Sequence, residues 1–120
     1  MTIGFIGTGN MGGSLARAVR RALPEERIIL ANKPSEAAAA LAEEICAEAS
    51  DNISVAKEAD YIFLGVKPNI VESVLGEISG ALAERKAPFV LISMAAGVKI
   101  EKIQSFAVGE WPVIRIMPNP

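Results

Sequence analysis

Three glycines near the N-terminus have the spacing of a loop that binds phosphate groups. Gly7, Gly9 and Gly12 form Gly-x-Gly-x-x-Gly directly after an apolar segment at residues 2–6 and before a helix-like segment. In this pattern the first glycine allows a sharp turn, the second lets the backbone approach a pyrophosphate, and the third lets a helix pack closely. The free N–H groups and the dipole at the start of that helix favour negative charge. We therefore predict a dinucleotide-binding loop; the alternative is a glycine-rich turn with a packing role only.

The residue types that are missing narrow the chemistry. The 120-residue sequence has no histidine, so it contains neither a His-dependent catalytic triad nor a Cys/His cluster for zinc. Cys46 is its only cysteine, which excludes an internal disulfide and fits a reducing cytoplasm. We expect Cys46 to be a small packing residue, and we expect no metal site. No residue stands out as a certain catalytic acid or base.

The composition predicts one folded domain without nucleic-acid or membrane partners. Hydrophobic residues make up 51% of the chain, which is enough for a core and argues against disorder. Twelve Lys and Arg against 14 Asp and Glu give a net charge of −2, which does not favour binding to nucleic acid or to an anionic membrane. No apolar run reaches transmembrane length, and residues 2–6 are too short for a signal peptide. We expect a cytoplasmic protein.

Strand-like and helix-like segments alternate along the chain. The expected strands are at residues 2–6, 28–31, 45–49, 60–66, 88–93 and 113–116. The expected helices are at residues 10–23, 35–44, 53–59, 68–82 and 100–106. Right-handed crossovers between these elements build an α/β fold of Rossmann type, a doubly wound parallel sheet of about six strands with helices on both faces.

Several local details follow from the same pattern. The spacing in the first helix leaves its arginines, Arg20 among them, in water. Its predicted buried face consists of Met11, Leu15, Val19, Ala22 and Leu23. Ser35 is expected to cap the second helix, and Asp51 or Asn52 the third. The continuous apolar run at residues 60–66 predicts a strand that is buried on both faces.

In a sheet of this kind, ligands bind at the carboxyl ends of the strands, where the strand order reverses. Four loops would meet at that edge, at residues 7–12, 31–34, 65–68 and 94–97. The sixth strand would bring Asn119 to the same edge.

The loop after the second strand bears on the choice of nicotinamide cofactor. NAD-binding folds usually carry Asp or Glu about twenty residues after the last glycine, where it accepts a hydrogen bond from the ribose 2′-hydroxyl. Here the count from Gly12 leads to Asn32 and Lys33, whose side chains donate to a 2′-phosphate that a carboxylate would repel. Glu36 is expected in the first turn of the next helix. We therefore predict NADPH, with NADH as the alternative; the plainer interpretation of Lys33 is a solvated loop charge.

Four segments, in this order, resemble the pyrroline-5-carboxylate reductase family. They are Gly-Phe-Ile-Gly-Thr-Gly-Asn-Met-Gly at 4–12, Phe-Leu-Gly-Val-Lys-Pro at 63–68, Ser-Met-Ala-Ala-Gly-Val at 93–98 and Arg-Ile-Met-Pro-Asn at 115–119. The resemblance spans the chain, and its second and third segments are more specific than the glycine loop. It implies NADPH-dependent, less often NADH-dependent, reduction of pyrroline-5-carboxylate to proline, the last step of proline biosynthesis.

The resemblance also implies where the ligands lie. The glycine loop would hold the pyrophosphate, Asn32, Lys33 and Asn52 would lie at the adenosine side, and the next two segments would border the nicotinamide. The implied cofactor-binding positions are Gly7, Thr8, Gly9, Asn10, Met11, Gly12, Asn32, Lys33, Asn52, Gly65, Val66, Lys67, Pro68, Met94, Ala95 and Ala96. Asn119 would lie near the imino-acid substrate. Lys67 either contacts a phosphate or the substrate, or extends into water.

Members of this family continue into a helical second domain that dimerises and supplies much of the substrate site. We therefore expect residues 1–120 to be the dinucleotide-binding domain of a longer, homo-oligomeric protein, with a truncated product as the alternative, and to turn over substrate poorly or not at all alone. The sequence departs from the family at Pro120, where threonine is common. Two other functions stay open. One is a related two-domain NADP-dependent dehydrogenase or reductase acting on a hydroxy acid or a deazaflavin; the other is a non-catalytic NADPH-binding module.

Overall fold

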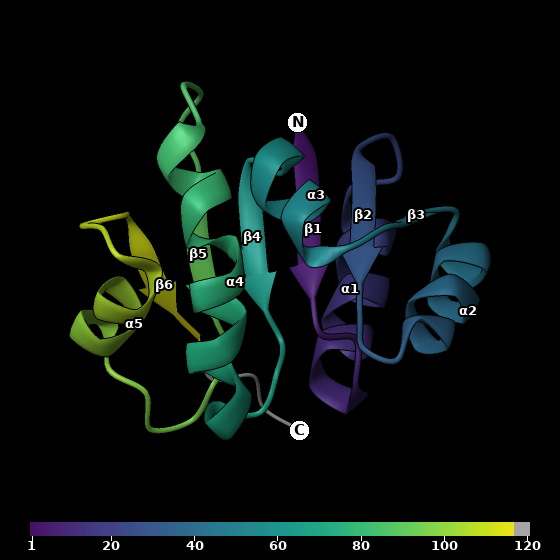
Figure 1. Ribbon diagram of the computed structural model, residues 1–120. Coiled ribbons are helices and arrows are strands. Elements are labelled where there is room, and N and C mark those ends of the chain that lie inside the picture. Colours follow the sequence, from purple (N-terminus) through teal and green to yellow (C-terminus); the bar gives the residue numbers. More distant parts are fainter. Residues whose placement is uncertain (117–120) are drawn as a thin grey trace.

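A computed structural model describes residues 1–116 and contains one six-stranded sheet. All neighbouring strands are parallel, in the order β3-β2-β1-β4-β5-β6. The strands are β1 (Thr2–Ile6), β2 (Arg27–Ala31), β3 (Glu48–Ala49), β4 (Tyr61–Leu64), β5 (Val90–Ser93) and β6 (Val113–Arg115) (Figure 1). The chain runs outward from β1 in one direction to β3, and then from β4 in the other direction to β6. The predicted doubly wound, Rossmann-type α/β fold is confirmed.

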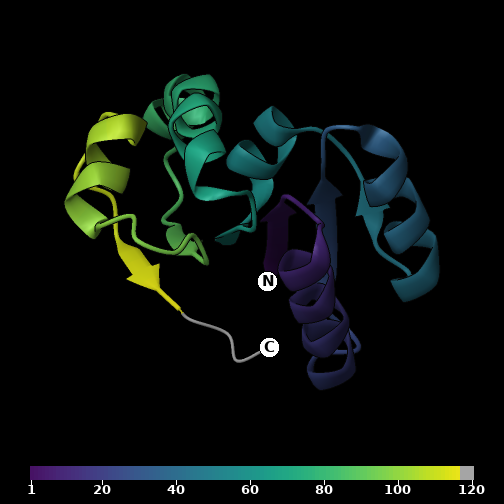
Figure 2. The ribbon, with the colours of Figure 1, turned by 90° about the horizontal axis from the view of Figure 1, so that it is seen from below.

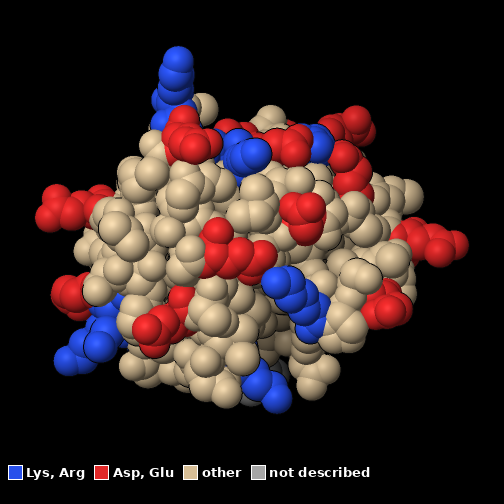
Figure 3. All heavy atoms as spheres, in the orientation of Figure 1, with Lys and Arg blue, Asp and Glu red and all other residues tan. Residues whose placement is uncertain are grey.

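Helices cover both faces of this sheet (Figure 2). One face carries α1 (Asn10–Ala22) and α2 (Ser35–Ile45). The other carries α3 (Asn52–Glu58), α4 (Val71–Glu84), which follows the short 3-10 helix η1 (Pro68–Ile70), and α5 (Ile100–Ala107). None of the helices within the described residues is long and apolar enough to cross a membrane. Lys and Arg are interspersed with Asp and Glu on the face that carries α3, α4 and α5 (Figure 3).

The two hydrophobic cores follow from the alternation of side chains along each strand. Phe5 and Leu30 are fully buried beneath α1 and α2, and Ile62 and Leu64 are fully buried beneath the helices of the other face. The prediction that the fourth strand is buried on both faces was wrong, because Tyr61 is 39% exposed. Within residues 1–116, no helix covers β4, β5 and β6 on the side of α1 (Figure 2).

The first helix lies against the sheet through small residues rather than through its predicted apolar face. Its buried residues are Gly12, Gly13 and Ala16. Of the predicted face, only Leu15 and Val19 are half-buried. The other three residues, Met11, Ala22 and Leu23, are exposed. Residues without bulky side chains let the backbone of α1 approach the glycine loop closely, and of the larger side chains only Leu15 and Val19 pack, half-buried, against the edge of the core. The prediction failed because it counted apolar side chains and ignored this approach.

Arg20, predicted to extend into water, instead holds two turns together. Its guanidinium donates hydrogen bonds to five backbone carbonyl oxygens, including those of Glu26 and Ile45, each at 2.8 Å. These acceptors lie just after α1 and at the end of α2, where helix carbonyl groups lack partners within the helix. Arg20 therefore fixes the connections into β2 and β3.

Two expectations at α2 were also wrong. Ser35 is the first residue of α2 and Pro34 is at its N-cap position, so no side chain caps this helix. Cys46 is exposed, at the C-cap of α2, with a left-handed backbone conformation (φ 55°). The expected cap of α3 is confirmed, because the Asp51 carboxylate accepts a hydrogen bond from the Ser54 backbone N–H at 2.7 Å.

Candidate functional site

The carboxyl ends of β1, β2, β4 and β5 meet at one edge of the sheet, the lower edge in Figure 1. The hydrogen bonding between the strands continues into the loops that follow them. The backbone N–H of Gly7 donates to the Ala31 carbonyl oxygen at 2.8 Å, and that of Gly65 donates to the Ile6 carbonyl oxygen at 2.7 Å. The loops are thus held in register with one another by the sheet itself.

The three glycines of the first loop differ in what surrounds them. Gly7 has a positive φ of 92°, a conformation that side chains disfavour. A Cβ atom on Gly12 would collide with the carbonyl oxygen of Gly7, so the start of α1 approaches the loop as closely as a glycine allows. A Cβ atom on Gly9 would have no heavy atom within 4 Å, so it would point into open space. Gly7 is therefore required by its backbone conformation and Gly12 by packing, whereas Gly9 borders a space that can receive a ligand.

This open space faces groups that suit an anion. Gly9 is at the N-cap position of α1 and no side chain caps the helix, so its first N–H groups and the positive end of its dipole are available. The Thr8 Oγ1 atom, in a residue only 9% exposed, is buried and has no hydrogen-bond partner within residues 1–116. The loop therefore fits a pyrophosphate group in shape and in charge.

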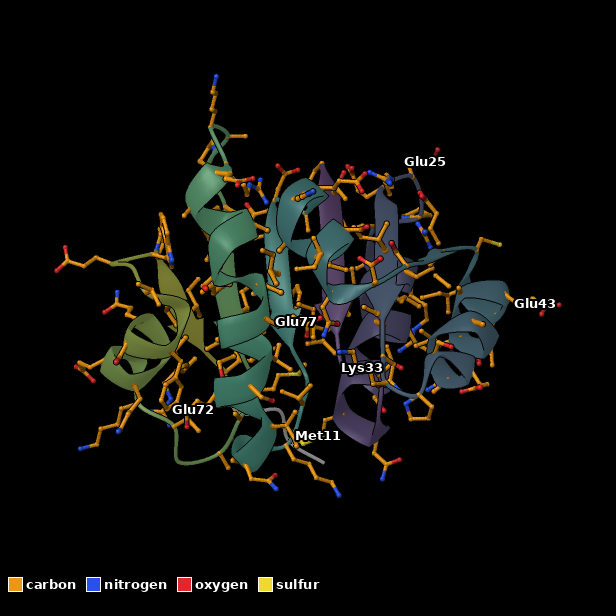
Figure 4. All side chains as sticks on the ribbon, in the orientation of Figure 1. Met11, Glu25, Lys33, Glu43, Glu72 and Glu77 are labelled. Atoms are coloured by element: carbon orange, nitrogen blue, oxygen red, sulfur yellow. The ribbon has the colours of Figure 1, made fainter. Side chains whose placement is uncertain are left out.

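A cleft of about 380 Å³, here called the main cleft, lies beside this loop. It brings together three segments that are far apart in the sequence. Its lining residues are Gly9, Asn10, Met11, Gly65, Val66, Lys67, Pro68, Met94, Ala95 and Ala96. Met94 and Ala95 are buried and form its floor, whereas Lys67 is exposed and Met11 projects from the start of α1 (Figure 4). Every one of these ten positions belongs to the set implied by the family resemblance.

A smaller hollow of about 130 Å³, here called the side hollow, lies on the other side of Val66, which lines both. Its lining residues are Ile6, Gly7, Asn32, Lys33, Asn52, Val66, Ile70, Ser73, Val74 and Glu77. The sequence pointed to five of these positions and missed the four between Ile70 and Glu77. Those four follow the i, i+3, i+4, i+7 spacing of one helical face, so the sequence could have shown that they lie together, but not that this face borders the loop after β2.

Asn32 positions the glycine loop. Its side-chain oxygen accepts a hydrogen bond from the Thr8 backbone N–H at 2.9 Å, and its amide nitrogen donates to the Pro34 carbonyl oxygen at 2.8 Å. The side chain thereby links the end of β2 to the loop that follows β1. Its contact with a cofactor stays a prediction.

The side hollow also contains a charged group that the sequence did not reveal. Asn52, only 4% exposed, donates from Nδ2 to the Glu77 carboxylate at 2.9 Å. The Lys33 ammonium lies 3.4 Å from both oxygens of the same carboxylate (Figure 4). A cation from the loop after β2, an amide from α3 and an anion from α4 thus converge on one point.

Two other expectations concern Asn119 and metal binding. Asn119 lies outside the described residues. Within residues 1–116, no group of three or more Asp, Glu or Cys side chains is placed to hold a metal ion.

One protein-family model matches most of the chain. The family model described as "NADP oxidoreductase coenzyme F420-dependent" matches residues 2–97. The chain belongs to this family. Membership agrees with the fold and with the glycine loop described above.

Within this family, the resemblance to pyrroline-5-carboxylate reductases is confirmed. The chain is 37% identical over 120 residues to the pyrroline-5-carboxylate reductase of Corynebacterium melassecola, a match that spans 98% of this chain and 44% of that protein. A solved pyrroline-5-carboxylate reductase from Coxiella burnetii superposes with a TM-score of 0.88 at 28% identity, over 98% of this chain and 44% of that one. The Plasmodium falciparum pyrroline carboxylate reductase, solved with NADP bound, superposes with a TM-score of 0.79 at 30% identity, over 99% of this chain and 42% of that one. The chain therefore spans less than half the length of these relatives.

Proposed function

We propose that this chain is the cofactor-binding domain of an NADPH-dependent oxidoreductase that reduces pyrroline-5-carboxylate to proline. The observation that carries the proposal is the open space at Gly9, which faces the uncapped start of α1 and opens into the main cleft. The similarity to pyrroline-5-carboxylate reductases, one of them solved with NADP bound, supports the choice of reaction and cofactor. NADH remains the alternative cofactor.

In this proposal the residues of the chain bind and orient rather than react. The N–H groups at the start of α1 bind the pyrophosphate, and the main cleft receives the nicotinamide half. Met94 and Ala95 are buried and close the floor of the cleft against water. The bound cofactor supplies a hydride to the carbon of a C=N bond. A protonated imine is already electrophilic, so the role of the chain is to set distance and alignment, and no catalytic acid is assigned to it.

A second part of the protein is needed to complete the site. Tyr61 and Ile114 lie on the side of β4, β5 and β6 that no helix of the described residues covers. Both are exposed, Ile114 to 50%. An apolar hollow of about 240 Å³ on the same side is lined by Met1, Ile3, Val19, Leu23, Tyr61 and Phe63. Large apolar side chains exposed on an uncovered sheet face are typical of an interaction site. Because the chain spans 44% of its Corynebacterium relative, we assign this surface to a helical segment after residue 120. That segment would also dimerise and supply the imino-acid site, in a cytoplasmic enzyme.

The test uses the longer protein encoded by the gene. Purified enzyme is mixed with NADPH and pyrroline-5-carboxylate, and the loss of reduced-nicotinamide absorbance is followed together with proline formation. Stoichiometric proline formation supports the proposal. Oxidation of NADPH with 2-oxo acids as substrates, but not with pyrroline-5-carboxylate, would overturn it.

The description of the family supplies a second candidate, transfer of hydride between NADP and the deazaflavin coenzyme F420. The same glycine loop and main cleft would serve it, since both reactions need the nicotinamide at the carboxyl edge of the sheet. Including coenzyme F420 in the same assay separates the two reactions. A domain that binds NADPH but gives no turnover with any of these substrates, even in the longer protein, would instead be a non-catalytic binding module.

A further inference from the structure

An acidic residue is missing at the end of β2, but α4 brings one to the same hollow. Asn32 and Lys33 occupy the positions where NAD-binding folds carry Asp or Glu. Glu77, 44 residues further along the chain, places its carboxylate 3.4 Å from the Lys33 Nζ atom (Figure 4). A rule that counts residues from the glycine loop cannot detect this carboxylate, because it arrives from another element.

The carboxylate of Glu77 is the better-fixed charge of the pair. It accepts a hydrogen bond at 2.9 Å from the side chain of Asn52, which is almost completely buried at the first turn of α3. The Glu77 side chain is only 33% exposed, whereas the Lys33 side chain is 76% exposed. Lys33 can therefore swing away from the hollow, but Glu77 is tied to the packed surface between α3 and α4.

We propose that Glu77 is a specificity-determining residue, whose carboxylate weakens the preference for a 2′-phosphorylated cofactor. The inference rests on the proposed function, because it takes the side hollow as the place of the adenosine ribose. A 2′-hydroxyl can donate a hydrogen bond to the carboxylate, whereas a 2′-phosphate, with about two negative charges, is repelled by it. Glu77 also pairs with Lys33, the cation that the sequence assigns to that position.

Two effects of Glu77 oppose each other, and their sizes decide the sign. By pairing with Lys33, Glu77 orients a cation toward the ligand, but pairs as exposed as this one hold their geometry weakly. The repulsion between a fixed carboxylate and a nearby phosphate in a half-exposed hollow is larger, roughly a 10-fold effect on affinity. Removing the charge of Glu77 should therefore favour NADPH.

The test is the substitution Glu77→Gln in the 120-residue chain, titrated with NADPH and with NADH by nicotinamide fluorescence. Glutamine retains the side-chain oxygen that accepts from Asn52, so only the charge changes. We expect NADPH to bind about 10-fold more tightly, and NADH to bind equally or more weakly, so that the ratio of the two affinities rises. An unchanged ratio would overturn the inference.

Glu72→Gln is the matched control. Glu72 lies on the same helix, is exposed and projects away from the side hollow (Figure 4), so the substitution changes the net charge by the same amount. Its affinity ratio should stay at the wild-type value; an equal rise in both variants would show a general charge effect and would refute the role of Glu77.

Lys33→Gln gives a second readout that does not depend on the folding of the Glu77 variant. The substitution leaves the Glu77 carboxylate without its cation, so it should lower the affinity for NADPH by about 10-fold and the affinity for NADH much less. Equal weakening of both would contradict the inference. If the wild-type chain binds neither nucleotide, the proposed function fails and this inference fails with it. If the wild type binds both and the ratios do not respond, only the inference fails.

Discussion

The side-chain oxygen of Asn32 accepts a hydrogen bond from the backbone N–H of Thr8 at 2.9 Å, and so couples the end of β2 to the glycine loop. The residue thus has a structural task at the position where dinucleotide-binding folds usually read the ribose. Because its amide also donates to the Pro34 carbonyl oxygen, both ends of the side chain are engaged within the protein.

Replacing Asn32 should therefore affect both nicotinamide cofactors. Asn32→Ala removes the acceptor for the Thr8 N–H, and we expect the affinities for NADH and NADPH to fall together by about 10-fold as the loop loosens. Asn32→Asp keeps the acceptor but adds a negative charge, so it should preserve NADH binding and weaken NADPH. Calorimetric titration of both variants checks this. A loss of NADPH binding alone in Asn32→Ala would show that the amide contacts the 2′-phosphate directly.

Alanine substitutions at Gly9 and Gly12 should have different effects, the first on nucleotide binding and the second on stability. In Gly9→Ala the new Cβ meets no protein atom, so the free energy of unfolding should change by less than about 1 kcal/mol. The same Cβ would occupy the space proposed for the pyrophosphate. We expect NADPH affinity to fall by at least about 10-fold in that variant. In Gly12→Ala the Cβ collides with the Gly7 carbonyl oxygen, and we expect a loss of stability of about 1–3 kcal/mol.

Urea denaturation and nucleotide titration of the two glycine variants give the comparison. The wild-type chain is the reference for both measurements. Undiminished NADPH binding by Gly9→Ala would mean that the space beside the glycine loop does not receive the pyrophosphate.

The fold was predictable because each strand and each following helix carries its own local signal. The boundaries that shifted did so by a few residues at strand ends, as for β4, expected at residues 60–66 and found at Tyr61–Leu64. The cap at Asp51 was predictable because an N-cap depends only on the next few residues. By contrast, the exposure of Tyr61 depends on which helices cover the sheet, and no local pattern records that.

The candidate site divides along the same line. The glycine loop and the strand ends could be located from the sequence because parallel strands bring their carboxyl ends to one edge. Glu77 could not, because its proximity to Lys33 depends on how α4 packs across α3. Likewise, the burial of Gly12 and Ala16 in α1 reflects a close approach of two backbones, which hydrophobic periodicity does not measure.

The 120-residue chain should bind NADPH and yet turn over pyrroline-5-carboxylate at a small fraction of the rate of the longer protein. In the proposed function the main cleft receives one side of the nicotinamide, and nothing in the described residues would cover its other side. Much of the rate of such a reaction comes from alignment of the two reactants, which is worth several orders of magnitude. Steady-state assays of both proteins at equal cofactor saturation check this. Comparable turnover by the two would refute the need for a second domain.

Asp51 makes the stability of the chain depend on pH. Its carboxylate accepts the backbone hydrogen bond from Ser54, which lowers the pKa of Asp51 in the folded state. The stabilisation is therefore fully present above the unfolded pKa of about 4, and it is lost as the pH falls through the lower folded value. Asp51→Ala should cost about 1 kcal/mol at pH 7, because the cap is lost.

Asp51→Asn is the control, since asparagine caps a helix but does not titrate. Urea denaturation at pH 7, 5 and 3 measures the difference in unfolding free energy between the wild type and this variant. Glu44 and Glu48 also have lowered pKa values, owing to hydrogen bonds from Arg17 and Arg27, and both are present in the two proteins, so their contributions cancel in the difference. The advantage of the wild type should decline between pH 5 and pH 3. A difference that stays constant over this range would show that the Asp51 charge does not contribute to the cap.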